Sequence, residues 1–207
     1  TTGSNNVAVG VDTLQANTTG AENVAVGEGA LDANTTASYN TAVGRSALTL
    51  NTTGAQNAGF GTYALQANTT GANNTAVGYQ ALDGNTTASN NTAVGYNSGV
   101  AVTTGTQNTI VGALAADAMT TGQNNVFVGY AAAGAGVVTG SSNIGIGVAA
   151  LGPLTSGANN IAIGEDAAAG LTTGSNNLLL GHDAGRTGSP GGSFGTSSNG
   201  ICLGDEN

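Results

Sequence analysis

The stretch TTGANNTAVGYQALDGN, residues 69–85, is one copy of a unit that recurs along the chain. Each copy carries an Asn four places before a Gly, as in Asn74 and Gly78. Eleven such anchor glycines are spaced by seventeen residues, with a single interval of eighteen, at positions 10, 27, 44, 61, 78, 95, 112, 129, 147, 164 and 181. A twelfth anchor, Gly204, follows an insertion. Such regular spacing predicts stacked coils, because the loops of a globular domain vary in length.

The composition also favours a stack of coils. The 207 residues include 36 Gly, no Trp and only 6 % charged side chains, which leaves little material for one large core. A flexible Gly/Ser/Thr/Asn linker would share this composition, but it would have no fixed apolar columns. Two such columns are present, so we exclude the linker interpretation.

The two apolar columns predict the strands of each coil. The residue before the anchor Gly is apolar in every copy, which we interpret as the core column: Val9, Val26, Val43, Phe60, Val77, Val94, Val111, Val128, Ile146, Ile163 and Leu180. A second column lies four residues after the Gly and shrinks in later copies: Leu14, Leu31, Leu48, Leu65, Leu82, Gly99, Ala116, Ala133, Leu151, Ala168 and Gly185. The predicted fold is all-β, a parallel β-roll (β-solenoid) of about twelve seventeen-residue turns with two short strands per turn.

A column of Asn predicts a structural ladder. Asn side chains in successive turns can hydrogen-bond along the stack and cap the start of each strand. The predicted ladder consists of Asn6, Asn23, Asn40, Asn57, Asn74, Asn91, Asn108, Asn125, Asn143, Asn160 and Asn177.

The first strand suggests that the chain associates with itself. In N-x-A-V-G, the x and Val side chains share one face, and the residue between them lies on the other. This middle position is never polar, so we expect one face to form the coil interior and the middle-residue face to be covered by another chain. An isolated coil of this composition also has few large apolar side chains to stabilise it. The predicted oligomer face consists of Ala8, Ala25, Ala42, Ala76, Ala93, Ile110, Phe127, Ala162 and Leu179.

These motifs resemble a known family. Residues 74–78 (NTAVG) and 160–164 (NIAIG) are similar to the N-S-V-A-I-G motif in the head repeats of YadA-type trimeric autotransporter adhesins. Similar T-G-x-N-N-T-A-V-G-Y-x-A-L arrays occur in phage and other viral tail-fibre proteins. The resemblance covers residues 1 to about 185 and implies a homotrimer of left-handed parallel β-rolls. The seventeen-residue period is closer to the fibre arrays than to the adhesin heads, whose repeats are typically shorter.

The ends of the chain suggest its organisation. We expect a repeat β-roll over residues 1–185, followed by an irregular loop and a last turn over residues 186–207 that lead to a further domain. The chain begins inside a T-T-G turn and ends just after an anchor Gly, so we expect a segment of a longer protein.

No catalytic, cofactor or metal site is predicted. The chain has one His (His182), one Cys (Cys202) and two basic residues, Arg45 and Arg186, so we expect neither a Cys-His pair nor a multi-His metal site within one chain. The carboxylates lie at scattered outward positions, without the G-G-x-G-x-D pattern of calcium-binding β-rolls. A net charge of −9 disfavours binding to nucleic acid or anionic membranes. No apolar run is long enough to span a membrane.

Two surface patterns could mediate recognition. Tyr79, Tyr96 and Tyr130 occupy one outward column, which suits either contact with a glycan or stacking of the rings on one another. Five N-T-T sequences fit either a glycosylation sequon or a turn; they begin at Asn17, Asn34, Asn51, Asn68 and Asn85.

The function expected from this sequence is non-enzymatic. The leading hypothesis is the shaft or head of a trimeric surface fibre, an extracellular structural and attachment segment of a phage or viral tail fibre or of a bacterial adhesin. Its partners would be its own copies and a host or environmental surface glycan. The alternative is a monomeric β-solenoid whose repetitive Thr/Asn surface binds ice or polysaccharide. A polysaccharide-cleaving solenoid is disfavoured, because no pair of carboxylates is clustered for that chemistry.

Overall fold

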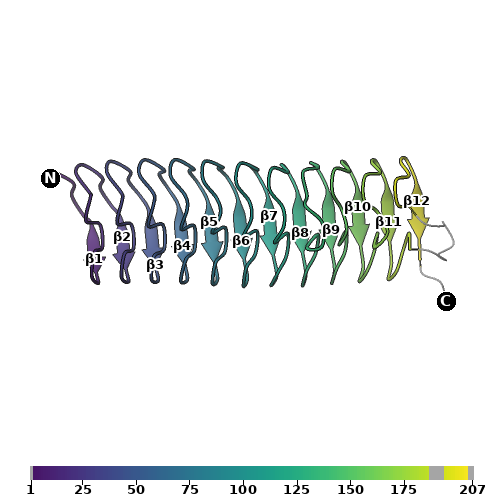
Figure 1. Cartoon of the computed structure of the whole chain (residues 1–207), viewed down its shortest axis with the longest axis horizontal. Coiled ribbons are helices and arrows are strands. Elements are labelled where there is room, and N and C mark those ends of the chain that lie inside the picture. The colour runs from purple at the N-terminus through teal and green to yellow at the C-terminus, as the bar shows by residue number, and fades with distance from the viewer. Residues whose placement is uncertain (1, 187–193, 205–207) are drawn as a thin grey trace. The chain divides into compact units, whose positions relative to one another are not determined.

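A computed structural model describes residues 2–186 and 194–204. The chain forms two compact units, residues 1–104 and 105–207, and each is described by itself. Each unit is a stack of coils with one three-residue strand per coil (Figure 1). The strands of the first unit are β1 (Val7–Val9), β2 (Val24–Val26), β3 (Thr41–Val43), β4 (Ala58–Phe60), β5 (Thr75–Val77) and β6 (Thr92–Val94). Those of the second unit are β7 (Thr109–Val111), β8 (Val126–Val128), β9 (Ile144–Ile146), β10 (Ile161–Ile163), β11 (Leu178–Leu180) and β12 (Ile201–Leu203).

Within each unit, neighbouring strands pair in parallel and in register with the sequence repeat. Val24 lies opposite Thr41 and Thr41 opposite Ala58, so equivalent positions form straight columns. The pairing of β11 with β12 keeps this register, with Leu178 opposite Ile201, although the intervening segment is longer. The predicted parallel β-solenoid is therefore confirmed. The loop predicted after residue 186 falls in large part outside the described residues.

The anchor glycines are required by both backbone conformation and space. Gly44 has a φ of +137°, which L side chains rarely adopt. A Cβ on Gly44 would lie 2.5 Å from the carbonyl oxygen of Gly61 in the next coil. Any larger residue would therefore push two coils apart, which explains why the column is invariant across the repeats.

The prediction of a second strand in each turn is wrong. Leu31, Leu48 and Leu65 have φ values of +52°, +53° and +54°, which is left-handed backbone and not strand. Short-range turn bonds hold this segment, such as Asn51 N–H to the Leu48 carbonyl at 3.1 Å. The Leu side chains nevertheless lie fully inside the coil, so their role as a core column is confirmed. A left-handed backbone disfavours β-branched residues, in agreement with a column made only of Leu, Ala and Gly.

The assignment of the two strand faces is also reversed. The middle residue of each strand, not the Val before the glycine, lines the core: Ala25, Ala42, Ala76, Ala93, Ile110, Phe127, Ala162 and Leu179 are 0 % exposed in the single chain. Ala8, in the first coil, has the same position but is exposed. Because these side chains already lie inside their own coil, they cannot form the predicted oligomer face. The Val column instead points outward.

The Asn column explains this orientation. Asn23 is fully buried, and Ala25 two residues later must lie on the same face of the chain as Asn23. Val24 and Val26 therefore point outward. Strand alternation fixes which residues share a face, but only the inward Asn decides which face is the interior.

Core volumes are balanced in the coils whose middle strand residue is large. Where the middle residue is large, the second column is small: Phe127 is paired with Ala133 and Leu179 with Gly185. A Cβ on Gly185 would lie 2.0 Å from Leu179 Cδ2, so the Leu side chain occupies the space that Gly185 leaves. Packing is therefore matched within a layer at Leu179 and Gly185 and between layers at Phe127, whose Cδ1 would lie 3.2 Å from a Cβ on Gly145 in the next coil.

Candidate interaction surface

The outward residues of the strands form an apolar surface on each unit, which we call the outer strand face. In the first unit it consists of two columns, Val7, Val24, Thr41, Ala58, Thr75 and Thr92 beside Val9, Val26, Val43, Phe60, Val77 and Val94. In the second unit the columns are Thr109, Val126, Ile144, Ile161, Leu178 and Ile201 beside Val111, Val128, Ile146, Ile163, Leu180 and Leu203. Thr is the most polar residue on this face.

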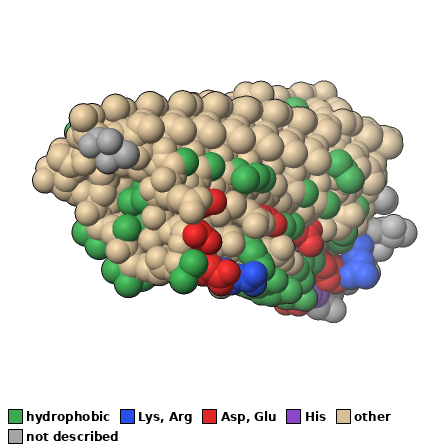
Figure 2. All heavy atoms as spheres, turned by 60° about the vertical axis from the view of Figure 1, so that its left-hand side comes forward, with side chains coloured by type: hydrophobic (Ala, Val, Ile, Leu, Met, Phe, Trp, Pro, Cys, Tyr) green, Lys and Arg blue, Asp and Glu red, His purple; other side chains and the backbone are tan. Residues whose placement is uncertain are grey.

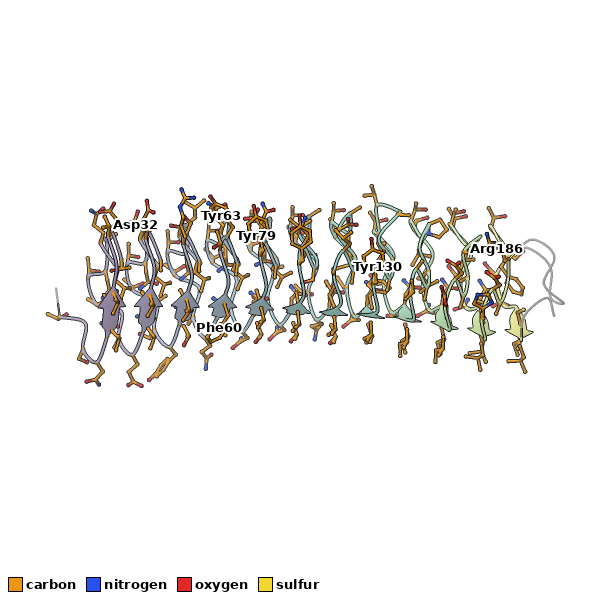
Figure 3. All side chains as sticks on the ribbon, turned by 90° about the horizontal axis from the view of Figure 1, so that it is seen from below. Asp32, Phe60, Tyr63, Tyr79, Tyr130 and Arg186 are labelled. Carbon is orange, nitrogen blue, oxygen red and sulfur yellow. The ribbon has the colours of Figure 1, made fainter. Side chains whose placement is uncertain are left out.

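Large side chains on this face are only half-covered by the chain itself. Phe60, Val77 and Ile163 are 40 %, 38 % and 41 % exposed. Figure 3 shows Phe60 pointing away from the ribbon, out of β4. Single exposed apolar residues are ordinary, but continuous apolar columns of this kind are typical of a surface that another molecule covers.

None of the residues of the outer strand face is charged. Both arginines are paired with carboxylates: Arg45 Nε lies 3.5 Å from Glu28 Oε2, and Arg186 donates to Asp183 Oδ1 at 2.7 Å. Figure 2 shows each Arg side chain (blue) next to acidic side chains (red). The face itself therefore carries no charge that opposes covering it with a second apolar surface.

The predicted Asn column forms a hydrogen-bonded ladder in each unit. The backbone N–H of Asn74 donates to Asn57 Oδ1 at 2.9 Å, and the Asn74 amide donates to the same oxygen at 3.1 Å and to the Ala88 carbonyl at 2.8 Å. The backbone N–H of Asn91 in turn donates to Asn74 Oδ1 at 3.0 Å. Each side chain thus links two strand starts and a neighbouring turn. All members from Asn23 onward are buried, which assigns the column a structural role.

A second Asn ladder was not predicted from the sequence. The Asn residues of the N-T-T sequences stack in the first unit, with Asn68 Nδ2 donating to Asn51 Oδ1 at 2.7 Å and to the Gly71 carbonyl at 2.9 Å. Asn34, Asn51, Asn68 and Asn85 are 0 % exposed, so a glycosylating enzyme has no access to their amides. The ladder ends where Val102 takes the next position, and Asn85 Oδ1 is left without a donor. The strict repetition of N-T-T every seventeen residues was the signal for this ladder.

The two residues of each Thr pair have different surroundings. The first Thr donates its hydroxyl to the next coil, as Thr52 Oγ1 does to the Thr69 carbonyl at 3.0 Å. The second Thr is exposed, as at Thr53 and Thr70. Within the first unit, these second Thr residues form an outward polar column.

Tyrosine rings of neighbouring coils contact one another in the first unit. Tyr79 and Tyr96 are stacked, with centroids 5.6 Å apart and an interplanar angle of 10°. Tyr63 meets Tyr79 edge-on at 6.0 Å and accepts a 2.8 Å hydrogen bond from Arg45. In Figure 3, Tyr63 and Tyr79 extend from neighbouring coils on the opposite side from Phe60. Stacked rings present edges and hydroxyls to solvent, which favours the stacking interpretation over a flat glycan platform. Tyr130 is exposed in the second unit.

The described residues contain no cluster of three metal-ligating side chains and enclose no pocket. His182 Nδ1 lies 3.5 Å from Asp183 Oδ2 on the surface, and Cys202 is buried. Burial raises the pKa of Asp83 and of Asp117, while a hydrogen bond from Gln80 opposes the shift at Asp83. These two carboxyls lie in different units. Among the described residues, no helix is long and apolar enough to cross a membrane.

Comparison with known proteins adds no further identification. No protein family, no curated protein and no solved structure matches this chain.

Proposed function

We propose that this chain is a non-enzymatic structural and attachment segment of a homotrimeric extracellular fibre, either a phage or viral tail fibre or a bacterial surface adhesin. In this proposal, three left-handed coils pack through the outer strand face of each unit. The threefold symmetry and the handedness rest on the resemblance to adhesin heads and fibre arrays.

The observation that carries the proposal is the outer strand face. It is continuous and uncharged in each unit, although the chain carries eleven acidic residues. A strand face that served only as solvent-exposed surface would include charged side chains, because these discourage association between sheets. Covering this face with further copies would remove its half-exposed Val, Ile, Leu and Phe side chains from water.

The mechanism is rigid, repetitive display. Buried Asn ladders and parallel strands fix each coil on the next, so outward columns keep a constant spacing of roughly 4.8 Å. Such a body suits a spacer that holds an attachment surface away from a virion or a cell. Contact with a host glycan is part of this proposal, without an assigned residue.

The test is the solution mass of the chain across a dilution series, by light scattering coupled to size-exclusion chromatography. We expect three times the chain mass of 19.7 kDa. Val77→Glu, on the outer strand face, should shift the mass toward one chain, since it would bury unpaired charge between copies. Thr70→Glu, on the outward Thr column, is the matched control and should leave the mass unchanged. A wild-type mass of one chain at all concentrations would refute the trimer.

The second candidate function is a monomeric solenoid that binds ice or polysaccharide. The exposed column of second Thr residues favours it, because it offers hydroxyls at regular spacing. A monomeric wild-type mass together with inhibition of ice recrystallisation, abolished by Thr53→Lys and Thr70→Lys together, would support this function over the fibre.

A further inference from the structure

The outer strand face of the first unit contains one layer unlike the others. In β4 the two outward residues are Ala58 and Phe60, whereas the outward pairs in β1, β2, β3, β5 and β6 combine only Val and Thr. Ala is the smallest and Phe the largest side chain on this face. The single large residue and the single small residue therefore occur in the same layer.

Such a balance has a physical meaning only where the face is covered. Inside the coil, Leu179 with Gly185 shows the same balance, because side chains that meet in a filled space must share its volume. Solvent sets no volume limit on an exposed pair. A Phe beside an Ala on the outer face therefore indicates a surface against which both side chains pack.

We propose that the outer strand faces of separate copies pack in register, with Phe60 of one copy seated on Ala58 of the next copy. The inference rests on the proposed self-association and assigns its register. Every other layer of the first unit then places Val of one copy against Val or Thr of its neighbour. A shift by one layer would place Phe60 on Thr41 or Thr75 and leave Ala58 opposite Val, which creates overpacking in one layer and a void in the next.

The packing is arranged around an axis parallel to the stack. In a closed ring of copies, the column that contains Phe60 meets the column that contains Ala58 on the neighbour, so each contact holds one Phe and one Ala. An antiparallel arrangement would reverse the order of layers and would generally separate this pair. The occupant of the face is therefore a second copy in the same direction.

Volume exchange tests the register. Ala58→Phe alone should overpack one layer and raise the concentration at which the oligomer dissociates by about ten-fold or more. The double variant Ala58→Phe with Phe60→Ala keeps one Phe and one Ala in each contact and should restore dissociation to within about three-fold of wild type. Ala58→Phe with Val77→Ala removes volume from the next layer and should not restore it.

Disulfide trapping supplies an independent readout, in a background with Cys202→Ala. Oxidation of Ala58→Cys/Phe60→Cys with diamide, which accepts the two electrons and two protons of the thiols, should join separate copies into a covalent ring. The two side chains leave one strand in parallel on the same face, so their Cβ atoms lie about 6.6 Å apart, beyond the ~4.5 Å that a disulfide spans, which excludes a bond within one chain. Ala58→Cys/Val77→Cys, offset by one layer, should give little product. The ring size on a non-reducing gel would report the number of copies.

The outcomes separate this inference from the proposed function. A monomeric wild-type chain would overturn both. If the wild-type chain is oligomeric, two results would overturn the register and leave the proposed fibre intact. The first is that Val77→Ala restores the association of Ala58→Phe to the same extent as Phe60→Ala. The second is that the offset cysteine pair cross-links as efficiently as the aligned pair.

Discussion

Replacing Asn74 by Ala tests whether the Asn ladder stabilises the stack. The substitution removes the acceptor of the Asn91 backbone N–H and the amide that donates to the Ala88 carbonyl. Asn57 Oδ1 keeps its bond from the backbone N–H of residue 74, and the Ala88 carbonyl keeps its 3.1 Å bond from Asn85 Nδ2, so the Asn91 backbone N–H is the buried group that loses its acceptor. One such group costs about 1–3 kcal/mol, which predicts a loss of that size in the free energy of unfolding.

Chemical denaturation followed by far-UV circular dichroism measures this loss. All variants are compared at one chain concentration, because association also shifts apparent stability. Thr70→Ala, an exposed position in the preceding turn segment, is the control and should change stability by no more than about 0.5 kcal/mol. A loss below about 1 kcal/mol for Asn74→Ala would refute the view that the buried amides hold the coils together.

Three further predictions concern the core, the pH dependence and the aromatic column. Leu65→Ile should cost more than the ~1.5 kcal/mol of an ordinary volume-conserving swap, because the φ of +54° disfavours a β-branched side chain; thermal unfolding checks this. Burial raises the pKa of Asp83 above 3.8, so the Asp83 carboxyl binds protons more tightly in the folded chain than in the unfolded chain. The free energy of unfolding should therefore fall as the pH rises from the pKa of Asp83 in the unfolded chain to its higher pKa in the folded chain. Asp83→Asn should make this fall smaller in denaturation curves measured from acidic to neutral pH. A double-mutant cycle of Tyr79→Ala and Tyr96→Ala should give a coupling energy of about 0.5–1.5 kcal/mol, and additive losses would contradict the stacking.

The repeat alone determined the parallel β-solenoid, the column register and the Asn positions that form the ladder. It also showed that x and Val of the first strand share one face. These features follow from periodicity, because a fixed period places equivalent residues above one another whatever the shape of the coil. The same reasoning could have found the second ladder, since N-T-T recurs at the same interval as the first Asn column.

Two features of the sequence indicate which strand face is the interior. A buried Asn ladder requires the residue two places later, Ala25 in the second coil, to point inward as well. Large middle residues also occur where the second column is small, as at Phe127 and Ala133. Hydrophobicity favoured the opposite choice, because Val is more apolar than Ala and was therefore assigned to the core.

Only the tertiary structure decided the direction of the side chains and the path of each coil. Alternation along a strand specifies two faces but not which one is enclosed, and the enclosed face depends on how the remaining residues of the coil return. At Leu48 that return takes a left-handed backbone with φ +53°, where the sequence pattern resembles a second strand. This bend brings Leu48 and Ala42 to the same interior. It leaves Val43 outside, because a coil this narrow encloses only one side of its strand.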